Sequence, residues 1–204
     1  SGNPVRKEIT ECKVSKSEAL SFFGLETGKP TVFVMGGSLG AKSINHAVNN
    51  MLSDFSLKNI QLIWQTGKSG MDMVKQVEGK FECVKAMPFI DRMDLAYQAA
   101  DVVVSRSGAM SVAELCAVKK PSIFVPFPHT AEDQQTANAK YLTDRDAAWM
   151  IKDSEVESKL KSMLFDLLSQ HDTQQKMSEK MGLYAPKDTA TFIANKIIEN
   201  VDKK

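Results

Sequence analysis

The chain has 204 residues, of which 43% are hydrophobic, enough to build the core of one large domain or two small ones. Its 26 basic and 25 acidic residues give a formal net charge of +1, and this balance lacks the electrostatic signature of a nucleic-acid-binding or anionic-membrane-binding protein. The 3 cysteines form no CxxC pair and the 3 histidines are scattered, which argues against a disulfide framework or a metal site and is typical of the reducing cytoplasm.

Short apolar segments alternate with amphipathic ones along roughly the first 150 residues. A helix is predicted around residues 17–23, after the capping pattern Ser15-Lys-Ser-Glu18. Several of the predicted strands are almost wholly apolar, as strands buried on both faces of a parallel sheet are. Six strands are predicted, at TVFVM (31–35), IQLIW (60–64), FECVK (81–85), DVVVS (101–105), PSIFVPF (121–127) and AAWMI (147–151).

Helical periodicity connects these strands and fills the end of the chain. After about residue 152 the pattern predicts two or three helices and no further strand, with a division near residues 182–186. Strands that alternate with helices predict right-handed βαβ units. We therefore expect an α/β fold, a Rossmann-like doubly wound parallel sheet with a helical C-terminal tail, that binds its ligand at the carboxyl ends of the strands. Apolar residues at helical spacing are Ile44, Ala47, Val48, Met51 and Leu52; Val156, Leu160, Met163, Leu164 and Leu167; and Ile193, Ala194, Ile197 and Val201.

The first candidate ligand loop is MGGSLGAKS, residues 35–43. Three glycines and Ser38 lead from a strand into a helix, so backbone N–H groups and the helix N-terminus could together cradle a phosphate. The segment matches neither a P-loop nor a strict GxGxxG pattern. A tight strand-to-helix turn is the alternative interpretation.

The second candidate loop lies within VVVSRSGAMSVAE, residues 102–114. Ser111 could cap the following helix, and free N–H groups at residues 109–112 would point at a ligand. Glu114 lies about 200° around the helix from Val112, so we expect it to face solvent beside the loop. A carboxylate near an anion-binding helix start suits a ribose phosphate, whereas an acidic residue that complements the helix dipole is the alternative.

The third candidate loop follows the predicted strand at residues 121–125, and a helix is expected to begin near residue 132 or 133. Gln134 and Asn138 lie on one face of that helix, with Gln135 beside them. Their amides suit sugar hydroxyls, although a solvated polar face is the alternative. His129 in the same loop is a candidate general base, or a hydrogen-bonding surface residue. Asp91, in PFIDRM, is expected to cap a helix.

Five segments, which are spread over essentially the whole chain up to about residue 140, form a specific pattern. They are GNPVR (2–6), GGSLGA (36–41), FID (89–91), ADVVVSRSGAMSVAE (100–114) and PSIFVPFPHTAEDQQTANA (121–139). In this order they resemble the carboxy-terminal half of the MurG family, the UDP-N-acetylglucosamine–N-acetylmuramyl-(pentapeptide) pyrophosphoryl-undecaprenol N-acetylglucosamine transferases.

The resemblance implies one half of a GT-B glycosyltransferase, in which two Rossmann-like domains enclose the active site. The carboxy-terminal domain of that family holds the donor UDP-GlcNAc, and the amino-terminal domain receives lipid I. The family transfers GlcNAc with inversion to make lipid II for peptidoglycan, at the cytoplasmic face of the inner membrane. The resemblance also implies that donor binding needs no metal ion or other cofactor.

Carried over position by position, the resemblance implies a donor site in this chain. Ser38 would contact the diphosphate, Arg6 would reach toward the donor from the hinge, and Ile90 would meet the uracil through its backbone. Arg106 would stand at the cleft, and Glu114 would bind the ribose hydroxyls. The phosphate and ribose would be lined by Gly108, Ala109, Met110, Ser111 and Val112, and the GlcNAc would be read by Gln134, Gln135 and Asn138.

The resemblance covers only half of such an enzyme. We expect residues 1–10 to be the remnant of an interdomain linker, residues 11–185 the UDP-GlcNAc-binding domain, and residues 186–204 a C-terminal helix. The general base would lie in the amino-terminal domain, so this chain would bind the donor without transferring its sugar. Two alternatives remain open: the catalytic subunit of a split two-chain N-acetylglucosaminyltransferase, and a non-catalytic nucleotide-sugar-binding module.

Overall fold

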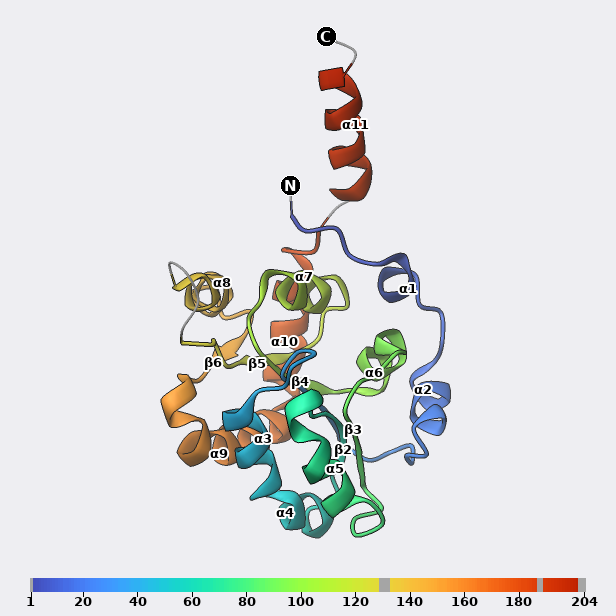
Figure 1. The fold of residues 1–204 in the computed structure, drawn as a ribbon, viewed down its shortest axis with the longest axis vertical. Helices are drawn as coiled ribbons and strands as arrows, with labels where there is room; N and C mark the ends of the chain where they lie inside the picture. Colours follow the sequence, from blue (N-terminus) through green and yellow to red (C-terminus); the bar gives the residue numbers. More distant parts are fainter. Residues whose placement is uncertain (1, 129–132, 187–188, 202–204) are drawn as a thin grey trace.

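A parallel sheet forms the centre of the molecule (Figure 1). The computed structural model describes residues 2–128, 133–186 and 189–201. Within these residues the sheet has six strands in the order β3-β2-β1-β4-β5-β6, and every neighbouring pair is parallel. The strands are β1 (Thr31–Met35), β2 (Gln61–Gln65), β3 (Val84–Met87), β4 (Val102–Ser105), β5 (Ser122–Phe124) and β6 (Trp149–Met150).

The predicted doubly wound parallel sheet is therefore confirmed, with some strand bounds corrected. β3 begins three residues later than expected, and only two residues of the expected last strand form β6. The strand order reverses between β1 and β4, which lie side by side in the middle of the sheet. In doubly wound folds such a reversal opens the crevice in which ligands bind.

Helices cover both faces of this sheet. Along β1 the side chains of Val32 and Val34 point to one face and that of Phe33 to the other, following the two-residue period of a strand. Helices α3, α4 and α9 pack on the first face, and α1, α2, α6, α7 and α8 on the second. The helices are α1 (Lys7–Thr10), α2 (Lys16–Phe22), α3 (Lys42–Asn49), α4 (Leu52–Leu57), η1 (Lys68–Gly70), α5 (Met71–Val77), α6 (Met93–Ala99), α7 (Ala109–Ala117), α8 (Gln134–Thr143), η3 (Asp153–Glu155), α9 (Val156–Ser169), α10 (His171–Gly182) and α11 (Thr189–Val201).

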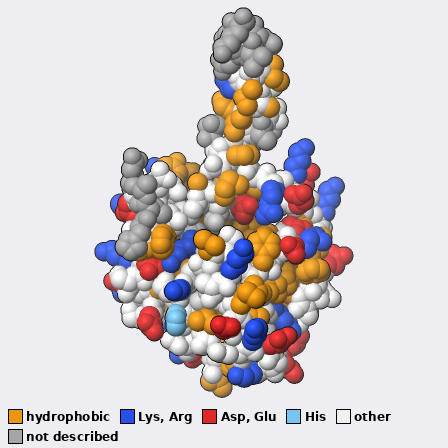
Figure 2. All heavy atoms as spheres, in the orientation of Figure 1, with side chains coloured by type: hydrophobic (Ala, Val, Ile, Leu, Met, Phe, Trp, Pro, Cys, Tyr) orange, Lys and Arg blue, Asp and Glu red, His pale blue; other side chains and the backbone are white. Residues whose placement is uncertain are grey.

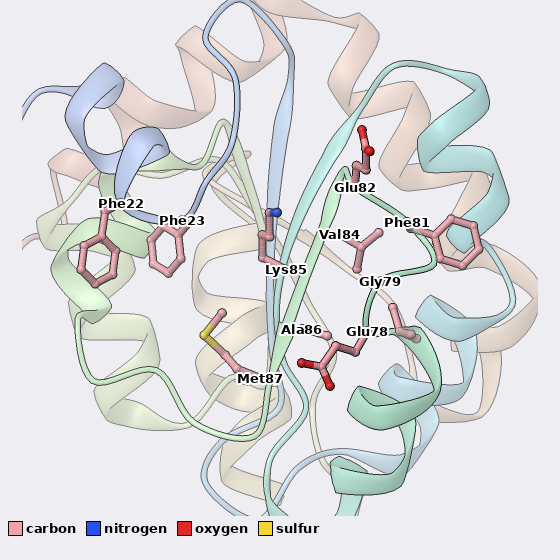
Figure 3. A pocket seen from close by; sticks show the side chains of 11 residues that line it. Phe22, Phe23, Glu78, Gly79, Phe81, Glu82, Val84, Lys85, Ala86 and Met87 are labelled. Atoms are coloured by element: carbon pink, nitrogen blue, oxygen red, sulfur yellow. The ribbon is translucent and has the colours of Figure 1, made fainter.

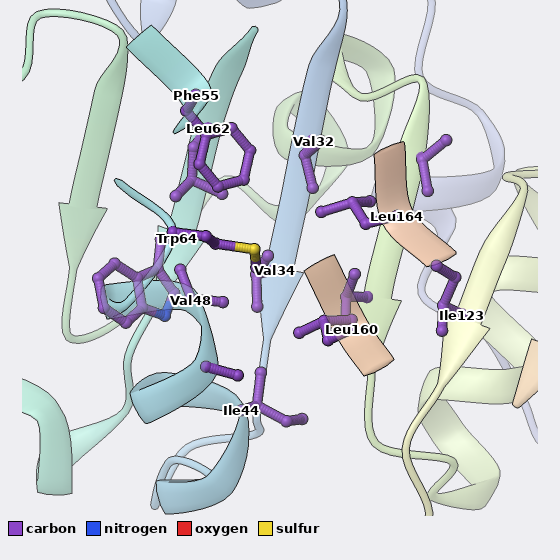
Figure 4. Close-up of a cluster of buried hydrophobic side chains, with 14 of the residues drawn as sticks. Val32, Val34, Ile44, Val48, Phe55, Leu62, Trp64, Ile123, Leu160 and Leu164 are labelled. Atoms are coloured by element: carbon purple, nitrogen blue, oxygen red, sulfur yellow. The ribbon is translucent and has the colours of Figure 1, made fainter. Parts of the chain in front are cut away.

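The first face carries a core cluster centred on β1 and β2 (Figure 4). Val34 and Trp64 are fully buried there, and the apolar stripes of α3 and α9 close over them. The indole Nε1 of Trp64 donates to Asn45 Oδ1 at 3.1 Å, so the polar edge of this buried ring is satisfied. The helical spacing that predicted the apolar faces of α3 and α9 is confirmed by this packing.

The helix ends both confirm and correct the expectations from sequence. Ser15 and Glu18 form the predicted capping box, since the Glu18 N–H donates to Ser15 Oγ and the Ser15 N–H donates to Glu18 Oε2 at 2.9 Å. The single helix expected around residues 42–52 is instead two, because α3 ends at the Asn49–Asn50 pair and asparagine is a poor helix former. The predicted Asp91 cap is also wrong: Arg92 occupies the N-cap position of α6, and no side chain caps that helix.

The last helix stands apart from the sheet and its covering helices (Figure 1). The expected division near residues 182–186 is confirmed, because α10 ends at Gly182 and α11 begins at Thr189. Apolar side chains run along α11 in the space-filling view (Figure 2). Phe192 and Ile197 of this helix are 49% and 59% exposed. Within the described residues, no helix is long and apolar enough to cross a membrane.

Lys120 gives the fold a measurable pH dependence. Its Nζ donates to the Ala100 carbonyl at 2.8 Å, and burial lowers the pKa of this ammonium group to about 8. Below pH 8 the Lys120 side chain is charged in both the folded and the unfolded state, and the folded state bears the cost of burying that charge. Between pH 8 and 10.5 Lys120 is neutral in the folded state but still charged in the unfolded state, so the free energy of unfolding rises with pH. We expect wild type to gain about 2 kcal/mol over Lys120→Met from pH 7 to pH 10, measured by urea unfolding. Parallel pH profiles of the two proteins would contradict this assignment.

Candidate functional site

The carboxyl ends of β1, β4 and β5 bring the three predicted ligand loops to one edge of the sheet. Met35 at the end of β1 is paired with Ser105 at the end of β4, and Ser105 is paired with Phe124 at the end of β5. The loops that follow these residues start side by side, as expected for parallel strands. We call this edge the carboxyl edge, and the predicted ligand loops all begin there.

The glycine-rich loop at residues 36–41 lies against the loop that follows β2. The Lys68 N–H donates to the Ser38 carbonyl at 3.1 Å, and the Ser69 N–H donates to the Leu39 carbonyl at 3.2 Å. Gly40 has φ +87°, and a Cβ atom there would lie 2.3 Å from the Thr66 carbonyl oxygen. A Cβ atom on Gly67 would lie 2.1 Å from Gly40 N. The tight-turn interpretation therefore accounts for Gly40, while the side chain of Ser38 is exposed at the tip of the loop.

The loop after β4 opens directly into α7. Gly108 is the N-cap residue and lacks a side-chain cap, so the prediction that Ser111 caps the helix is wrong: Ser111 lies within the first turn. The Val112 N–H makes the first intrahelical bond, to the Gly108 carbonyl at 3.0 Å. The N–H groups of residues 109–111 precede that bond, and helix geometry directs them out of the helix start. Ala109 and Met110 are exposed beside them, as a ligand-lining position requires.

Glu114 does not face solvent, and the expectation that it would is wrong. It is only 8% exposed, and the Tyr97 hydroxyl of α6 donates to its Oε2 at 2.9 Å. Arg6, which precedes α1, approaches the other carboxylate oxygen, with Nη2 3.5 Å from Oε1. The helical wheel failed because it considered only the packing of α7 on the sheet, whereas Tyr97 of α6 and Arg6 of the N-terminal segment also contact α7. Glu114 is nevertheless held at the carboxyl edge by groups that stabilise its charge.

Arg106 ties the carboxyl-edge loops together. Its Nη1 donates to the carbonyls of Val125 at 3.1 Å and Pro126 at 3.2 Å, and it forms an ion pair with Asp153. Its Nη2 donates to Ser43 Oγ at 3.1 Å. These partners lie in the loop after β5, at the start of η3 and in the first turn of α3. With a side chain only 11% exposed, Arg106 makes these contacts inside the protein.

The amide side chains of α8 also take part in this loop network. The Phe127 N–H donates to Gln135 Oε1 at 3.0 Å, and Asn138 Nδ2 donates to the Ser107 carbonyl at 3.0 Å. The Ser107 hydroxyl donates in turn to the Gln135 carbonyl at 2.8 Å. Gln134, the first residue of α8, is exposed, so the helix begins within a residue of the expected Asp133. Gln135 and Asn138 thus connect α8 to the loops that follow β4 and β5.

Two further predictions concern Ile90 and His129. The Ile90 N–H already donates to Gln65 Oε1 at 3.0 Å, and its side chain is 2% exposed. A backbone contact between Ile90 and a base would therefore use the carbonyl, since the N–H is engaged. His129 lies outside the described residues.

Two pockets are relevant to the carboxyl edge, one along β3 and one at the start of α8. One of about 490 Å³ runs along β3 and is bounded by Phe22, Phe81 and Lys85 (Figure 3). None of the predicted site residues lines it. Another of about 420 Å³ adjoins the start of α8, between Thr136 and Asp153. Among the residues that the structure describes, no cluster of three His, Cys, Asp or Glu side chains could hold a metal ion.

Sequence reasoning missed three residues that shape the carboxyl edge. Tyr97 holds Glu114, Asp153 holds Arg106, and Gly67 makes room for Gly40. A tyrosine within the apolar run Leu95–Ala96–Tyr97 was a usable signal, because a buried hydroxyl needs a partner. Asp153 and Gly67 are distant in sequence from their partners, and nothing in the local pattern connects them.

Comparison with known proteins gives a consistent result. The glycosyltransferase family 28 C-terminal domain matches residues 31–199. A Cytophaga hutchinsonii protein named UDP-N-acetylglucosamine–N-acetylmuramyl-(pentapeptide) pyrophosphoryl-undecaprenol N-acetylglucosamine transferase is 44% identical, over 100% of this chain and 55% of its own length. A Flavobacterium psychrophilum protein of the same name is 39% identical, again over 100% of this chain and 55% of its own length. The chain thus spans about half the length of the curated relatives that it matches.

Comparison of the fold with solved structures points to the same family of proteins. The crystal structure of Acinetobacter baumannii MurG superposes with a TM-score of 0.76 at 25% sequence identity, over 93% of this chain and 55% of that one. The six-stranded parallel sheet and its helices thus have the architecture of one half of a GT-B protein.

Proposed function

Because the chain belongs to the glycosyltransferase family 28 C-terminal domain family, we propose that it is the donor-binding domain of an inverting N-acetylglucosaminyltransferase. In this proposal the domain holds UDP-GlcNAc, and the complete enzyme transfers the GlcNAc to lipid I to make lipid II for peptidoglycan. The names of relatives that are 39–44% identical along the whole chain support this assignment. The two alternatives, a split two-chain transferase and a non-catalytic module, gain no support from these relatives.

The single observation that carries the proposal is the convergence of three loops where the strand order reverses, between β1 and β4. The start of α7 offers free N–H groups to the diphosphate, which needs no metal ion if helix dipoles and amides hold it. We propose that Glu114 binds the ribose hydroxyls, that Ile90 meets the uracil and that Arg6 lies at the entrance. The diphosphate and ribose are lined by Ser38, Gly108, Ala109, Met110, Ser111 and Val112. The sugar is faced by Gln134, Gln135 and Asn138.

Partners and location follow as parts of the same proposal. Residues 1–10 act as the linker from an acceptor domain, residues 11–185 form the donor domain, and α11 (Thr189–Val201) is the C-terminal helix. Lipid I reaches the active site through the acceptor domain, at the cytoplasmic face of the membrane. The general base belongs to that domain as well, so this chain by itself binds the donor and does not transfer it.

Calorimetric titration of this chain with UDP-GlcNAc, UDP-glucose and UDP tests the proposal. We expect UDP-GlcNAc to bind at least about tenfold more tightly than UDP-glucose, because a sugar site that pairs with the acetamido group leaves polar groups unpaired when that group is missing. CMP is the control for the base and should not bind.

Absence of heat with every uridine nucleotide would contradict the proposal. Equal affinities for UDP-GlcNAc and UDP would support the nucleotide site but contradict the proposed contacts of Gln134, Gln135 and Asn138 with the sugar. Transfer of GlcNAc to a lipid I analogue by this chain alone would contradict the placement of the general base in another domain.

A further inference from the structure

Tyr97 is held rigidly beneath the carboxyl edge. It is fully buried, and its ring meets Phe33 of β1 edge-on, with the centroids 5.6 Å apart and an interplanar angle of 69°. The hydroxyl lies 3.6 Å from Met35 Sδ and donates to Glu114 Oε2 at 2.9 Å. Packing therefore fixes where the phenol O–H points, and it points at the carboxylate.

The hydrogen bond from Tyr97 keeps its direction over the physiological pH range. Burial, and then the negative charge of Glu114, raise the pKa of Tyr97 well above its usual value. The phenol therefore stays protonated and remains the donor, with the carboxylate as acceptor. A donor that cannot rotate away constrains the plane of the Glu114 carboxylate.

The two carboxylate oxygens of Glu114 differ as a result. Oε2 accepts the hydrogen bond from the buried Tyr97 hydroxyl. Oε1 lies 3.5 Å from Nη2 of Arg6, whose side chain is 54% exposed. Oε1 thus faces the half-exposed Arg6 guanidinium, whereas Oε2 faces the buried Tyr97. A buried acceptor whose orientation is fixed before binding loses less conformational entropy when it accepts from a ligand hydroxyl.

We propose that Tyr97 is a positioning residue that orients the Glu114 carboxylate to accept hydrogen bonds from the ribose hydroxyls of a uridine nucleotide. This inference rests on the proposed function and extends it to a residue that does not itself touch the ligand. It implies that the contribution of Tyr97 to affinity exists only when the ligand has ribose hydroxyls and position 114 carries a carboxylate.

Tyr97→Phe removes the hydroxyl and keeps the ring packed on Phe33. We expect the variant to bind UDP about tenfold more weakly, the scale of one hydrogen bond to a charged group, and to bind 2′,3′-dideoxy-UDP within about twofold of wild type. Tyr141→Phe is the matched control, since Tyr141 is 52% exposed on α8, and its affinities should equal those of wild type. Thermal unfolding of each variant shows whether the fold is retained.

Two further variants separate positioning from general loosening of the structure. In a Glu114→Gln background, adding Tyr97→Phe should weaken UDP binding by less than about twofold, because the two residues act as one unit. Tyr97→4-aminophenylalanine keeps the ring and restores an N–H donor, so UDP affinity should return to within about threefold of wild type.

The outcomes distinguish this inference from the proposed function. If the wild-type chain binds no uridine nucleotide, both are wrong. If wild type binds UDP and Tyr97→Phe binds it equally well, or loses affinity equally for UDP and its dideoxy analogue, only the inference is overturned. Failure of the 4-aminophenylalanine variant to recover affinity would overturn it as well, even if Tyr97→Phe does not fold.

Discussion

Arg106→Met is expected to lower the free energy of unfolding by about 3 kcal/mol, because it removes one partner of a largely buried ion pair and leaves Asp153 uncompensated. The carbonyls of Val125 and Pro126 lose a charged donor in the same step. Since the guanidinium joins four carboxyl-edge segments, we also expect UDP binding to weaken by at least about tenfold in the protein that remains folded. Urea unfolding and calorimetry measure the two effects.

Two variants control for simpler explanations of the Arg106 result. Arg145→Met removes an exposed arginine that follows α8 and bonds the end of that helix, with Nη1 2.8 Å from the Tyr141 carbonyl, and should change stability by less than about 0.5 kcal/mol. Arg106→Lys keeps the charge but not the planar fork, so it should recover less than half of the lost stability. Full recovery with lysine would mean that charge alone matters at position 106.

Gly67→Ala is expected to destabilise the protein by about 4 kcal/mol and to displace the loop at residues 36–41. Its φ of +72° disfavours any residue with a Cβ atom, and the new methyl group would lie 2.1 Å from Gly40 N, which belongs to a backbone that cannot rotate away. Because the displaced loop is the one that carries Ser38, weaker UDP binding should accompany the loss of stability. Urea unfolding gives the first quantity and calorimetry the second.

Gly79→Ala is the matched control for this prediction. Gly79 has a similar φ of +74°, but a Cβ atom there has no other atom within 4 Å. Only the backbone strain remains, so the cost should be about 1 kcal/mol with unchanged UDP affinity. Equal losses in the two variants would show that strain alone, rather than the contact between the two loops, sets the requirement for glycine at position 67.

Much of the fold could be predicted because its signals are local. Six short apolar segments that form the parallel strands are visible in sequence, and parallel pairing brings the loops after β1, β4 and β5 together without further information. The capping box at Ser15 and Glu18 likewise depends on four consecutive residues. Errors occurred where a local rule met a non-local contact, as when Glu114 was expected to face solvent but meets Tyr97 and Arg6.

The side-chain environment of the site was less predictable for the same reason. The orientation of Glu114 depends on Tyr97 from one helix and Arg6 from the N-terminal segment, and no periodicity within α7 contains either. Arg106 was identified as a site residue, yet its partners Ser43 and Asp153 come from chain positions far on either side. The sequence thus indicated which loops matter, whereas the hydrogen-bond network that shapes them required three-dimensional information.

The contact between Gly40 and Gly67 has a consequence for how this protein can evolve. A side chain gained at either position occupies the space of the other backbone, so neither loop can change its path by a single substitution that keeps its neighbour in place. Divergence of the two loops must therefore be joint, through paired replacements or a change in loop length. We therefore expect the glycine-rich loop and the turn after β2 to change together in evolution, although some 25 residues of chain separate them.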